Sequence, residues 1–222
     1  LRTYDGYASF NFEDFSLPIE SLLSADNNPQ AAQSLVDEML SGNDSLIGSR
    51  DGGSVYTRLL GGDDFVELHS GLLNDVNTNW GADTIHLFGG GGRLRAGKDN
   101  DRIQIMGGQW QPVNGNNGDD IITNYSSFAG TVRGGKDNDF IENVGGGYFY
   151  GDLGADIFKP WALDSYGNPI NGMMFIMDYQ PGVDSIDLSG AGVVNFVYSE
   201  GDTMIGSAYT GNVIAVVENV IF

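Results

Sequence analysis

Residues 134–141 read GGKDNDFI, a glycine-rich and acidic stretch that runs directly into two large apolar side chains. A single copy would be an ordinary loop. The central pattern, an aspartate followed two positions later by an apolar residue, returns at intervals of 20, 19, 18, 19, 19 and 17 residues. The repeated aspartates are Asp44, Asp64, Asp83, Asp101, Asp120, Asp139 and Asp156. Such even spacing indicates an internal structural repeat of about 19 residues.

A second apolar position lies seven residues before five of these aspartates, at Val76, Leu94, Val113, Val132 and Phe149. In each unit, the distance from this second apolar position to the apolar residue after the aspartate is always nine residues. The distance from that residue to the second apolar position of the next unit varies between eight and ten residues. A turn of fixed length opposite a loop of variable length is typical of a parallel β-solenoid, in which each unit is one coil with a strand on either side. The sequence therefore predicts an all-β fold, a parallel β-roll (solenoid) of about seven coils.

Side chains alternate along a strand, so we expect the repeated apolar residues to point inward and to form two ladders. One ladder follows the aspartates and the other precedes them. Their members are Val66, Ile85, Ile103, Ile122, Ile141 and Phe158, and Val76, Leu94, Val113, Val132 and Phe149.

The repeats occupy residues 44–160, and both open ends of such a roll need a cap. In the N-terminal segment, residues 1–43, a stretch that begins with Asn-Pro at 28 and carries a helical apolar stripe predicts a helix over 28–42. Residues 7–15 predict a strand beside it. The C-terminal region, residues 161–222, contains further strand-like segments and predicts a β cap.

Composition limits the partners of the 222-residue chain. It has 34 glycines and no cysteine, and 30 acidic residues against 10 basic ones give a formal net charge of −20. This charge argues against nucleic acid as a partner, because phosphates require cationic neutralisation. The absence of cysteine excludes disulfides and zinc–thiolate sites. No apolar run reaches the ~18 residues of a transmembrane helix, so the sequence predicts no transmembrane segment. The large excess of acidic residues points to a cation as the partner.

Stacking the repeat places its aspartates in a column. Equivalent residues of adjacent parallel coils lie about 4.8 Å apart. Two carboxylates at this distance repel by about 1 kcal/mol at the dielectric constant of water and by about 3 kcal/mol at an effective value of 20. Calcium is the natural neutraliser, because it takes six to eight oxygens from carboxylates and backbone carbonyls in flexible geometry. The alternative is that each aspartate is only a turn residue that forms local hydrogen bonds.

The residues of these turns also match a known family. AGKDNDRI, GNNGDDII, GGKDNDFI and GDLGADIF, which begin at residues 96, 115, 134 and 151, resemble the nonapeptide repeat G-G-x-G-x-D-x-U-x of RTX (hemolysin-type calcium-binding) proteins. The resemblance implies a β-roll with calcium between successive turns. In that family, the first and third carbonyls of one turn and the second and fourth of the next join the two aspartates around each ion.

Carried to this chain, the resemblance implies carbonyl ligands and carboxylate ligands along one edge. The carbonyl ligands are Ala96, Lys98, Gly115, Asn117, Gly134, Lys136 and Gly151, and the carboxylate ligands are Asp64, Asp83, Asp101, Asp120, Asp139 and Asp156. RTX proteins usually have the motif at both edges of the roll, whereas this chain has it at one edge. We therefore expect a single row of about four to five Ca²⁺ ions. Four ions would lie in the gaps between successive aspartates from Asp83 to Asp156, and a fifth between Asp64 and Asp83. In two turns the fourth residue is Asp99 or Asp137 instead of glycine, which leaves the backbone angle there open.

The resemblance also implies a function and a location. It implies a secreted bacterial module, extracellular or at the cell surface, that folds on binding calcium after export by the type I secretion machinery. The stretch GVDSIDLS at residues 182–189 resembles the region after the repeats in serralysin-type proteins. We expect no enzyme active site in this chain, because its two histidines, His69 and His86, belong to no catalytic motif.

Two further functions remain open from the sequence. A structural subunit of a surface layer, adhesin or extracellular filament would self-assemble, and the outward apolar residues favour such contacts: Phe65, Ile121, Phe140 and Ile157. An accessory module of a secreted enzyme would bind an acidic polysaccharide through cations beside aromatic rings. The candidate residues for this are Arg93, Arg95 and Arg133, near Tyr148 and Tyr150.

Overall fold

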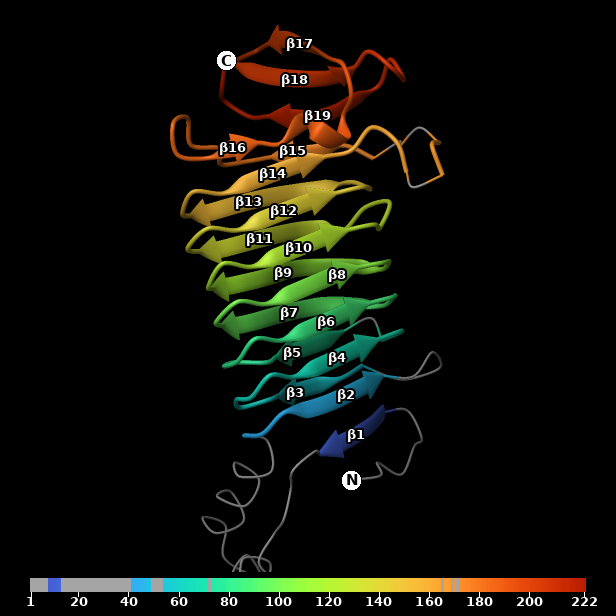
Figure 1. The fold of residues 1–222 in the computed structure, drawn as a ribbon. Coiled ribbons are helices and arrows are strands. Elements are labelled where there is room, and N and C mark those ends of the chain that lie inside the picture. The colour runs from blue at the N-terminus through green and yellow to red at the C-terminus, as the bar shows by residue number, and fades with distance from the viewer. Residues whose placement is uncertain are drawn as a thin grey trace, which may run out of the picture.

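The computed structural model describes residues 8–12, 41–48, 54–71, 73–164, 166–168, 170 and 172–222. These residues form two sheets that face each other along the length of the molecule (Figure 1). The nine-stranded sheet consists, in spatial order, of β1 (Ala8–Phe12), β2 (Asp44–Gly48), β4 (Phe65–Leu68), β6 (Thr84–Leu87), β8 (Arg102–Ile105), β10 (Ile121–Asn124), β12 (Phe140–Asn143), β14 (Ile157–Pro160) and β16 (Ser185–Ile186). The ten-stranded sheet consists of β17 (Val194–Ser199), β18 (Asp202–Ser207), β19 (Val213–Val217), β15 (Met174–Ile176), β13 (Gly147–Leu153), β11 (Gly130–Lys136), β9 (Gln109–Asn117), β7 (Gly91–Lys98), β5 (Asn74–Asn77) and β3 (Tyr56–Arg58).

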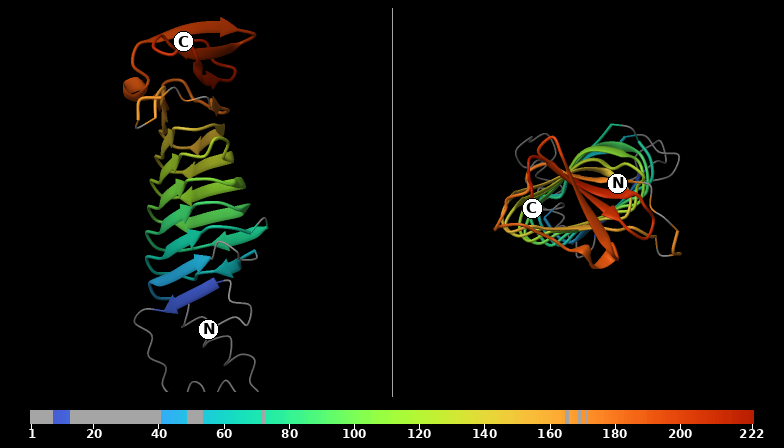
Figure 2. Two further views of the ribbon diagram at one scale, coloured as in Figure 1. Left: turned by 90° about the vertical axis from the view of Figure 1, so that its right-hand side faces the viewer. Right: turned by 90° about the horizontal axis from the view of Figure 1, so that it is seen from above.

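From β2 to β15 the chain alternates between the two sheets, and each strand pairs in parallel with the equivalent strand of the next coil. This is a parallel β-solenoid, and the coils superpose when it is seen along its axis (Figure 2). The prediction of an all-β parallel roll is therefore confirmed. Within the described ranges the one helical element is a short 3-10 turn, Leu188–Gly190.

The two predicted apolar ladders are present, in register. Ile85, Ile103, Ile122, Ile141 and Phe158 are paired one above the other in the nine-stranded sheet. The second ladder is continuous from Val76 to Phe149 in the ten-stranded sheet. All members of both ladders have no exposed surface, and a further inward row adds residues such as Leu68, Leu87 and Ile105. Each fully buried aliphatic side chain stabilises the fold by about 1.5–3 kcal/mol, so the roll has a continuous dry core.

The two ends of the roll are built differently. At the N-terminal end β1 pairs antiparallel with β2, so the predicted strand is confirmed. The predicted helix over 28–42 lies outside the described residues up to residue 40. At the C-terminal end both sheets continue past residue 160, because β15 pairs with β13 and β16 pairs with β14. Strands β19, β18 and β17 then extend the ten-stranded sheet and close the end of the roll (Figure 1).

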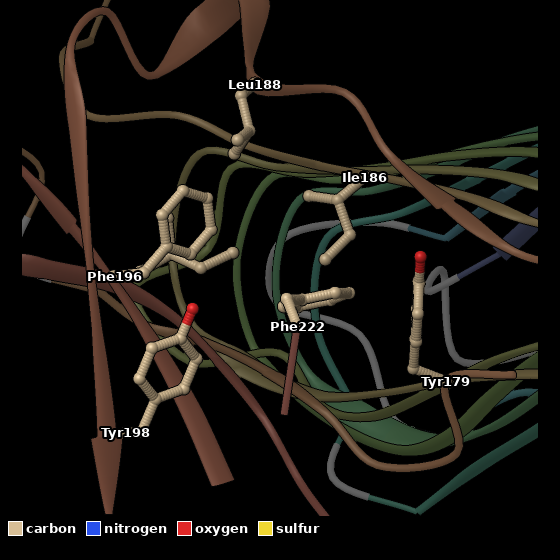
Figure 3. A pocket seen from close by; sticks show the side chains of 7 residues that line it. Tyr179, Ile186, Leu188, Phe196, Tyr198 and Phe222 are labelled. Atoms are coloured by element: carbon tan, nitrogen blue, oxygen red, sulfur yellow. The ribbon is translucent and has the colours of Figure 1, made fainter. Parts of the chain in front are cut away.

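An apolar hollow of about 310 Å³ lies between the last coil and this C-terminal cap. Aromatic and aliphatic side chains from the roll and from β17 and β18 point into it (Figure 3). The lining residues are Tyr179, Ile186, Leu188, Phe196, Tyr198, Ile205 and Phe222.

Candidate metal site at the glycine-rich edge

The predicted aspartates lie at one edge of the roll, where each strand of the ten-stranded sheet turns into the next strand of the nine-stranded sheet. We number the six residues of each turn 1 to 6, so that position 6 is the repeated aspartate. The turns are residues 59–64, 78–83, 96–101, 115–120, 134–139 and 151–156. The position-6 residues, together with Asp44, are called the aspartate column below.

The aspartate column is buried and hydrogen-bonded from coil to coil. Each of its seven members, Asp44 to Asp156, is at most 5% exposed. The backbone N–H of each donates to Oδ1 of the next aspartate along the column, at 2.8–3.1 Å. The column thus fixes the register of the coils as a side chain-to-backbone ladder.

The second oxygen of every carboxylate has no partner. Oδ2 is buried and accepts no hydrogen bond in all seven members of the column. An unsatisfied buried polar atom costs about 1–3 kcal/mol, and more when it is charged. A row of such oxygens within a well-packed edge therefore requires protons or a cation.

Burial raises the pKa of these carboxyl groups from the ordinary 3.8. The pKa is about 6 for Asp44, Asp83 and Asp156, about 7 for Asp120, about 8 for Asp64 and Asp139, and about 9 for Asp101. Desolvation is the largest cause throughout. From Asp64 onward, the N–H donated by the preceding aspartate lowers the pKa in part and nearby like charges raise it again. A bound cation would lower the pKa of these carboxyl groups again, because it favours their ionised form.

Glycine at position 1 allows the unpartnered carboxylate oxygen of the same turn to lie where any other residue would place its Cβ atom. A Cβ atom on Gly115 would lie 1.9 Å from Asp120 Oδ2 and 2.7 Å from the Gly134 carbonyl oxygen. On Gly134 or Gly151, it would lie 2.1 Å from Oδ2 of the aspartate in the same turn. None of these three glycines has a backbone in the left-handed region, so glycine is required here because the carboxylate lies against its Cα atom. We call these three glycine–carboxylate contacts the cradles.

Left-handed residues alternate along each turn. In all five turns from 78 to 156, positions 2 and 4 have positive φ, and their residues are Asn79 and Gly81, Gly97 and Asp99, Asn116 and Gly118, Gly135 and Asp137, and Asp152 and Gly154. Asp99 and Asp137 have φ of 73° and 74°. Since aspartate tolerates this region better than most residues, the two aspartates at position 4 leave the turn conformation unchanged.

The residues predicted as carbonyl ligands fall into two groups. The position-1 residues Ala96, Gly115, Gly134 and Gly151 are buried, and their role as carbonyl ligands stays a prediction. The position-3 residues Lys98, Asn117 and Lys136 lie at the ends of β7, β9 and β11. The Lys136 carbonyl accepts from the Gly118 N–H at 3.3 Å, so it takes part in the backbone ladder.

The donor set suits calcium. Within the part of the chain that the structure describes, no three Asp, Glu, His or Cys side chains lie close enough to hold a metal by themselves. An ion beside one of these glycine–carboxylate contacts would therefore be bound by carboxylates of adjacent coils together with backbone carbonyl oxygens. Calcium accepts such all-oxygen sites, whereas zinc prefers His and Cys and magnesium demands a stricter octahedron.

The aspartate column extends one coil beyond the prediction. Asp184 accepts from the Asp156 N–H through Oδ1 at 3.1 Å and from the Gln180 N–H through Oδ2 at 2.7 Å. Its carboxylate is fully partnered and ends the row. The only sequence signal was Ile186, two positions after it, because the interval of 28 residues from Asp156 breaks the repeat.

A second ladder at position 5 was not predicted. The side chains of Asn43, Asp63, Asn100, Asp119 and Asn138 accept from the position-5 N–H of the next coil at 2.7–3.0 Å. These groups are exposed and need no ion. They hold the outer side of the turns together, while the buried column faces the core.

The arginine patch lies on the outer face of the ten-stranded sheet, as expected. Arg95 and Arg133 share a register position, and Tyr150 follows them. Arg95 Nη2 donates to Asp75 Oδ1 at 2.5 Å. Arg133 donates to the Asp152 carboxylate and lies over the Tyr150 ring, 4.5 Å from its centroid. Two of the three arginines are thus paired with outward carboxylates, and polysaccharide binding by this patch stays a prediction.

The outward apolar column on the nine-stranded sheet is shorter than the sequence suggested. Ile121, Phe140 and Ile157 are adjacent in register. Two polar residues, Thr84 and Arg102, separate them from Phe65.

His86 lies within β6, on the outer face of the nine-stranded sheet, and His69 directly follows β4. His86 contacts Phe65 and Phe88 edge-on, at centroid distances of 5.4 and 6.1 Å. His69 Nε2 lies 2.6 Å from Glu67 Oε1. Neither histidine is near the aspartate column.

Comparison with known proteins adds no assignment: no family model matches the chain, and neither a curated protein nor a solved structure does. None of the helices in the described residues is long and apolar enough to cross a membrane. The geometry thus defines a class, a parallel β-roll with a buried column of carboxylates along one edge.

Proposed function

We propose that the protein is a secreted calcium-binding β-roll module of the RTX type, which gains its folded stability when calcium neutralises the aspartate column. One observation carries the proposal. Seven buried carboxylate oxygens stand in a row without a hydrogen-bond partner, and three of them lie against a glycine, where any Cβ atom would clash with them. A bound calcium ion would supply the positive charge that these oxygens lack.

The energetics favour a folding switch. Extracellular calcium modules bind at about 10⁻⁴–10⁻³ M. At millimolar calcium and a dissociation constant of about 10⁻⁴ M, each ion adds about 1.4 kcal/mol of stability. In a calcium-poor cytosol the cost of burying and ionising the column would keep the chain unfolded, which suits export through a type I secretion channel. Outside the cell, calcium would drive folding, and the roll would serve as a structural, secretion-linked domain.

Far-UV circular dichroism during a calcium titration of chelated protein tests the proposal. We expect a cooperative gain of β signal near millimolar calcium and no comparable effect of magnesium. A protein that is fully folded in chelator, and whose melting temperature calcium does not raise, would contradict it. The apolar ladders and the position-5 ladder would then suffice for folding, and the carboxylates would be neutralised by protons.

The second candidate, a structural subunit, is favoured by strand β17. It is the terminal strand of the ten-stranded sheet and reads VNFVYS, without charge, proline or glycine. Phe196, Val197 and Tyr198 are 43%, 54% and 50% exposed. Such an uncharged edge can pair with the edge of a second copy.

Size-exclusion chromatography in calcium separates the two candidates. A polymer or dimer that Val197→Lys dissociates, while Tyr209→Lys leaves it intact, would favour assembly through β17. Tyr209 is the matched control, because it is 79% exposed at the same end but lies outside the strand. A monomer for the unmodified chain would leave the module as the better assignment.

A further inference from the structure

A hollow of about 360 Å³ lies where strands β10, β12 and β14 end, at the edge of the roll opposite the aspartate column. Tyr125, Val144 and Trp161 directly follow these strands in three successive coils, and their backbone N–H groups donate to the preceding coil. The repeat thus brings equivalent positions of neighbouring coils together in one wall. The other contributors are Tyr166 and two acidic side chains, Glu142 and Asp164. The volume is in the range of small-ligand sites, about 300–1,000 Å³.

The indole ring of Trp161 is held in place by three contacts. Its Nε1 donates to Glu142 Oε1 at 2.7 Å. The ring packs against Gly190, where a Cβ atom would lie only 2.7 Å from Cδ2 of the indole. The Lys159 ammonium lies 4.9 Å from the ring centroid. The indole is therefore a fixed wall of the hollow, and a ligand that contacts it would not have to order it.

Two tyrosine rings at the hollow are left largely uncovered by the fold. Tyr125 is 45% exposed and Tyr166 is 88% exposed. A tight loop presents Tyr166, because the N–H groups of Tyr166 and Asn168 donate to Asp164 Oδ1 at 2.9 and 2.8 Å. A tyrosine ring has an apolar face and a hydroxyl that can donate and accept. Both rings are therefore available to a ligand that has apolar and polar surfaces.

The charges at the hollow are already partnered. Glu142 Oε1 lies 3.7 Å from Lys159 Nζ, and the Asp164 carboxylate accepts three hydrogen bonds from Tyr166 and Asn168 of its own loop. Two carboxylates disfavour an anionic ligand. The ammonium of Lys159 already lies beside Glu142 and over the indole, where a cationic ligand would bind. The hollow therefore suits a neutral ligand, and each carboxylate can still accept a hydroxyl because it has about four acceptor positions.

We infer that this hollow binds a sugar ring of a neutral polysaccharide, which contacts the rings of Tyr125 and Tyr166 and donates hydroxyl groups to Glu142. A sugar ring combines the two surfaces that the hollow requires, since its carbon-bound hydrogens form apolar faces and its hydroxyls line the rim. The inference goes beyond the proposed calcium function. It also differs from the arginine patch, which lies on the other sheet and would bind an acidic polymer.

A chain of sugars fits better than a single sugar, because the row of apolar side chains continues beyond the hollow. Phe88 and Met106 directly follow β6 and β8, one position after the strand as Tyr125 is, and each is 42% exposed. Their N–H groups donate to the preceding coil in the same way. A linear polymer that lies along the roll would meet one such side chain in each coil.

Biolayer interferometry of the full chain on immobilised polysaccharides tests the inference. The surfaces carry starch, dextran, galactomannan or a mixed-linkage β-glucan, with alginate as the acidic comparison, and the buffer contains millimolar calcium. We expect binding to at least one neutral polysaccharide, at an affinity that is the same at low and high ionic strength because no charge pair forms. Binding to none of the four neutral surfaces, or binding that salt abolishes, overturns the inference.

Substitutions at the exposed rings locate the site. We expect Tyr125→Ala and Tyr166→Ala each to weaken binding about threefold to tenfold, with no change in melting temperature. Tyr56→Ala is the matched control, because this tyrosine is 68% exposed in β3 on the other sheet, and it should leave binding unchanged. Full affinity in both tyrosine variants, or a loss of the same size in Arg133→Ala of the arginine patch, overturns the inference.

Discussion

At the scale of single residues, the aspartate column combines two roles that oppose each other energetically. Oδ1 accepts a backbone N–H from the neighbouring coil, and a hydrogen bond to a charged group stabilises by about 1.5–3 kcal/mol. Oδ2 is buried without a partner, and its desolvation opposes ionisation. The ladder is therefore strongest when a proton or a cation removes the cost of the second oxygen.

This balance predicts how the stability of the calcium-free protein depends on pH. The pKa of Asp120 is raised to about 7 and that of Asp139 to about 8, from 3.8 in the unfolded chain. Between pH 3.8 and pH 7 to 8, the folded state thus binds more protons than the unfolded state. The contribution of these groups to stability is therefore fully present below pH ~4 and is lost as the pH rises through 7 to 8. In chelator, we expect a higher melting temperature at pH 5 than at pH 8.

Two controls distinguish the pH dependence caused by the aspartate column from that caused by the other acidic groups of the chain. Asp120→Asn cannot ionise, so it should reduce the difference in melting temperature between pH 5 and pH 8. Saturating calcium binds the ionised carboxylates and should shrink or reverse the difference. A melting temperature in chelator that rises from pH 5 to pH 8 would contradict the role assigned to the column.

At the scale of the turn, two neighbouring glycines serve different purposes. Gly135 has φ of 130°, and a Cβ there would lie 2.2 Å from the Asn116 carbonyl oxygen, which is part of the backbone. Gly134 has an ordinary backbone, and its Cβ would meet the Asp139 side chain, with Oδ2 at 2.1 Å, Cγ at 2.6 Å and Cβ at 2.8 Å. The first glycine of the pair lets the column carboxylate approach the backbone, and the second allows the turn itself.

Alanine at the two positions should therefore separate folding from calcium binding. Gly135→Ala forces a left-handed alanine against backbone and should destabilise by at least about 2 kcal/mol, in chelator and in calcium alike. Gly134→Ala displaces the Asp139 side chain, whose Oδ1 accepts the Asp120 N–H, so it should destabilise in chelator and lose more in calcium, where the carboxylate would also bind the ion. Urea unfolding of both variants in chelator and in calcium measures these changes. If Gly134→Ala lowers the free energy of unfolding equally in both conditions, the result argues against an ion bound beside Gly134.

The turn also shows what the sequence can and cannot predict. The spacing of apolar residues predicted the coils, their register and the edge at which the aspartates meet, because these follow from strand periodicity alone. The position-5 ladder and the closure by Asp184 were not predicted, since each depends on which atom of the next coil faces the side chain. A repeat places a residue in its column, but its partner is known only when the coils are stacked.

At the scale of the whole molecule, the roll is nearly one-dimensional, because each coil contacts only its neighbours (Figure 1). In such proteins stability is a sum of terms for single coils and for the interfaces between them. The aspartate column contributes to every interface from Asp44 to Asp184. The C-terminal cap ends it with a partnered carboxylate.

Coupling between column residues should therefore depend on their separation along the roll. Asp120 and Asp139 share one interface, because the Asp120 N–H donates to Asp139 Oδ1 at 2.9 Å, and an ion between their coils would bind both. In a double-mutant cycle with Asp120→Ala and Asp139→Ala, measured by urea unfolding in calcium, we expect a coupling energy of about 0.5–3 kcal/mol. The control cycle pairs Asp139→Ala with Asp44→Ala, five coils away, and should be additive within about 0.5 kcal/mol. Additive losses in both cycles would show that the aspartates act singly, without a shared ion.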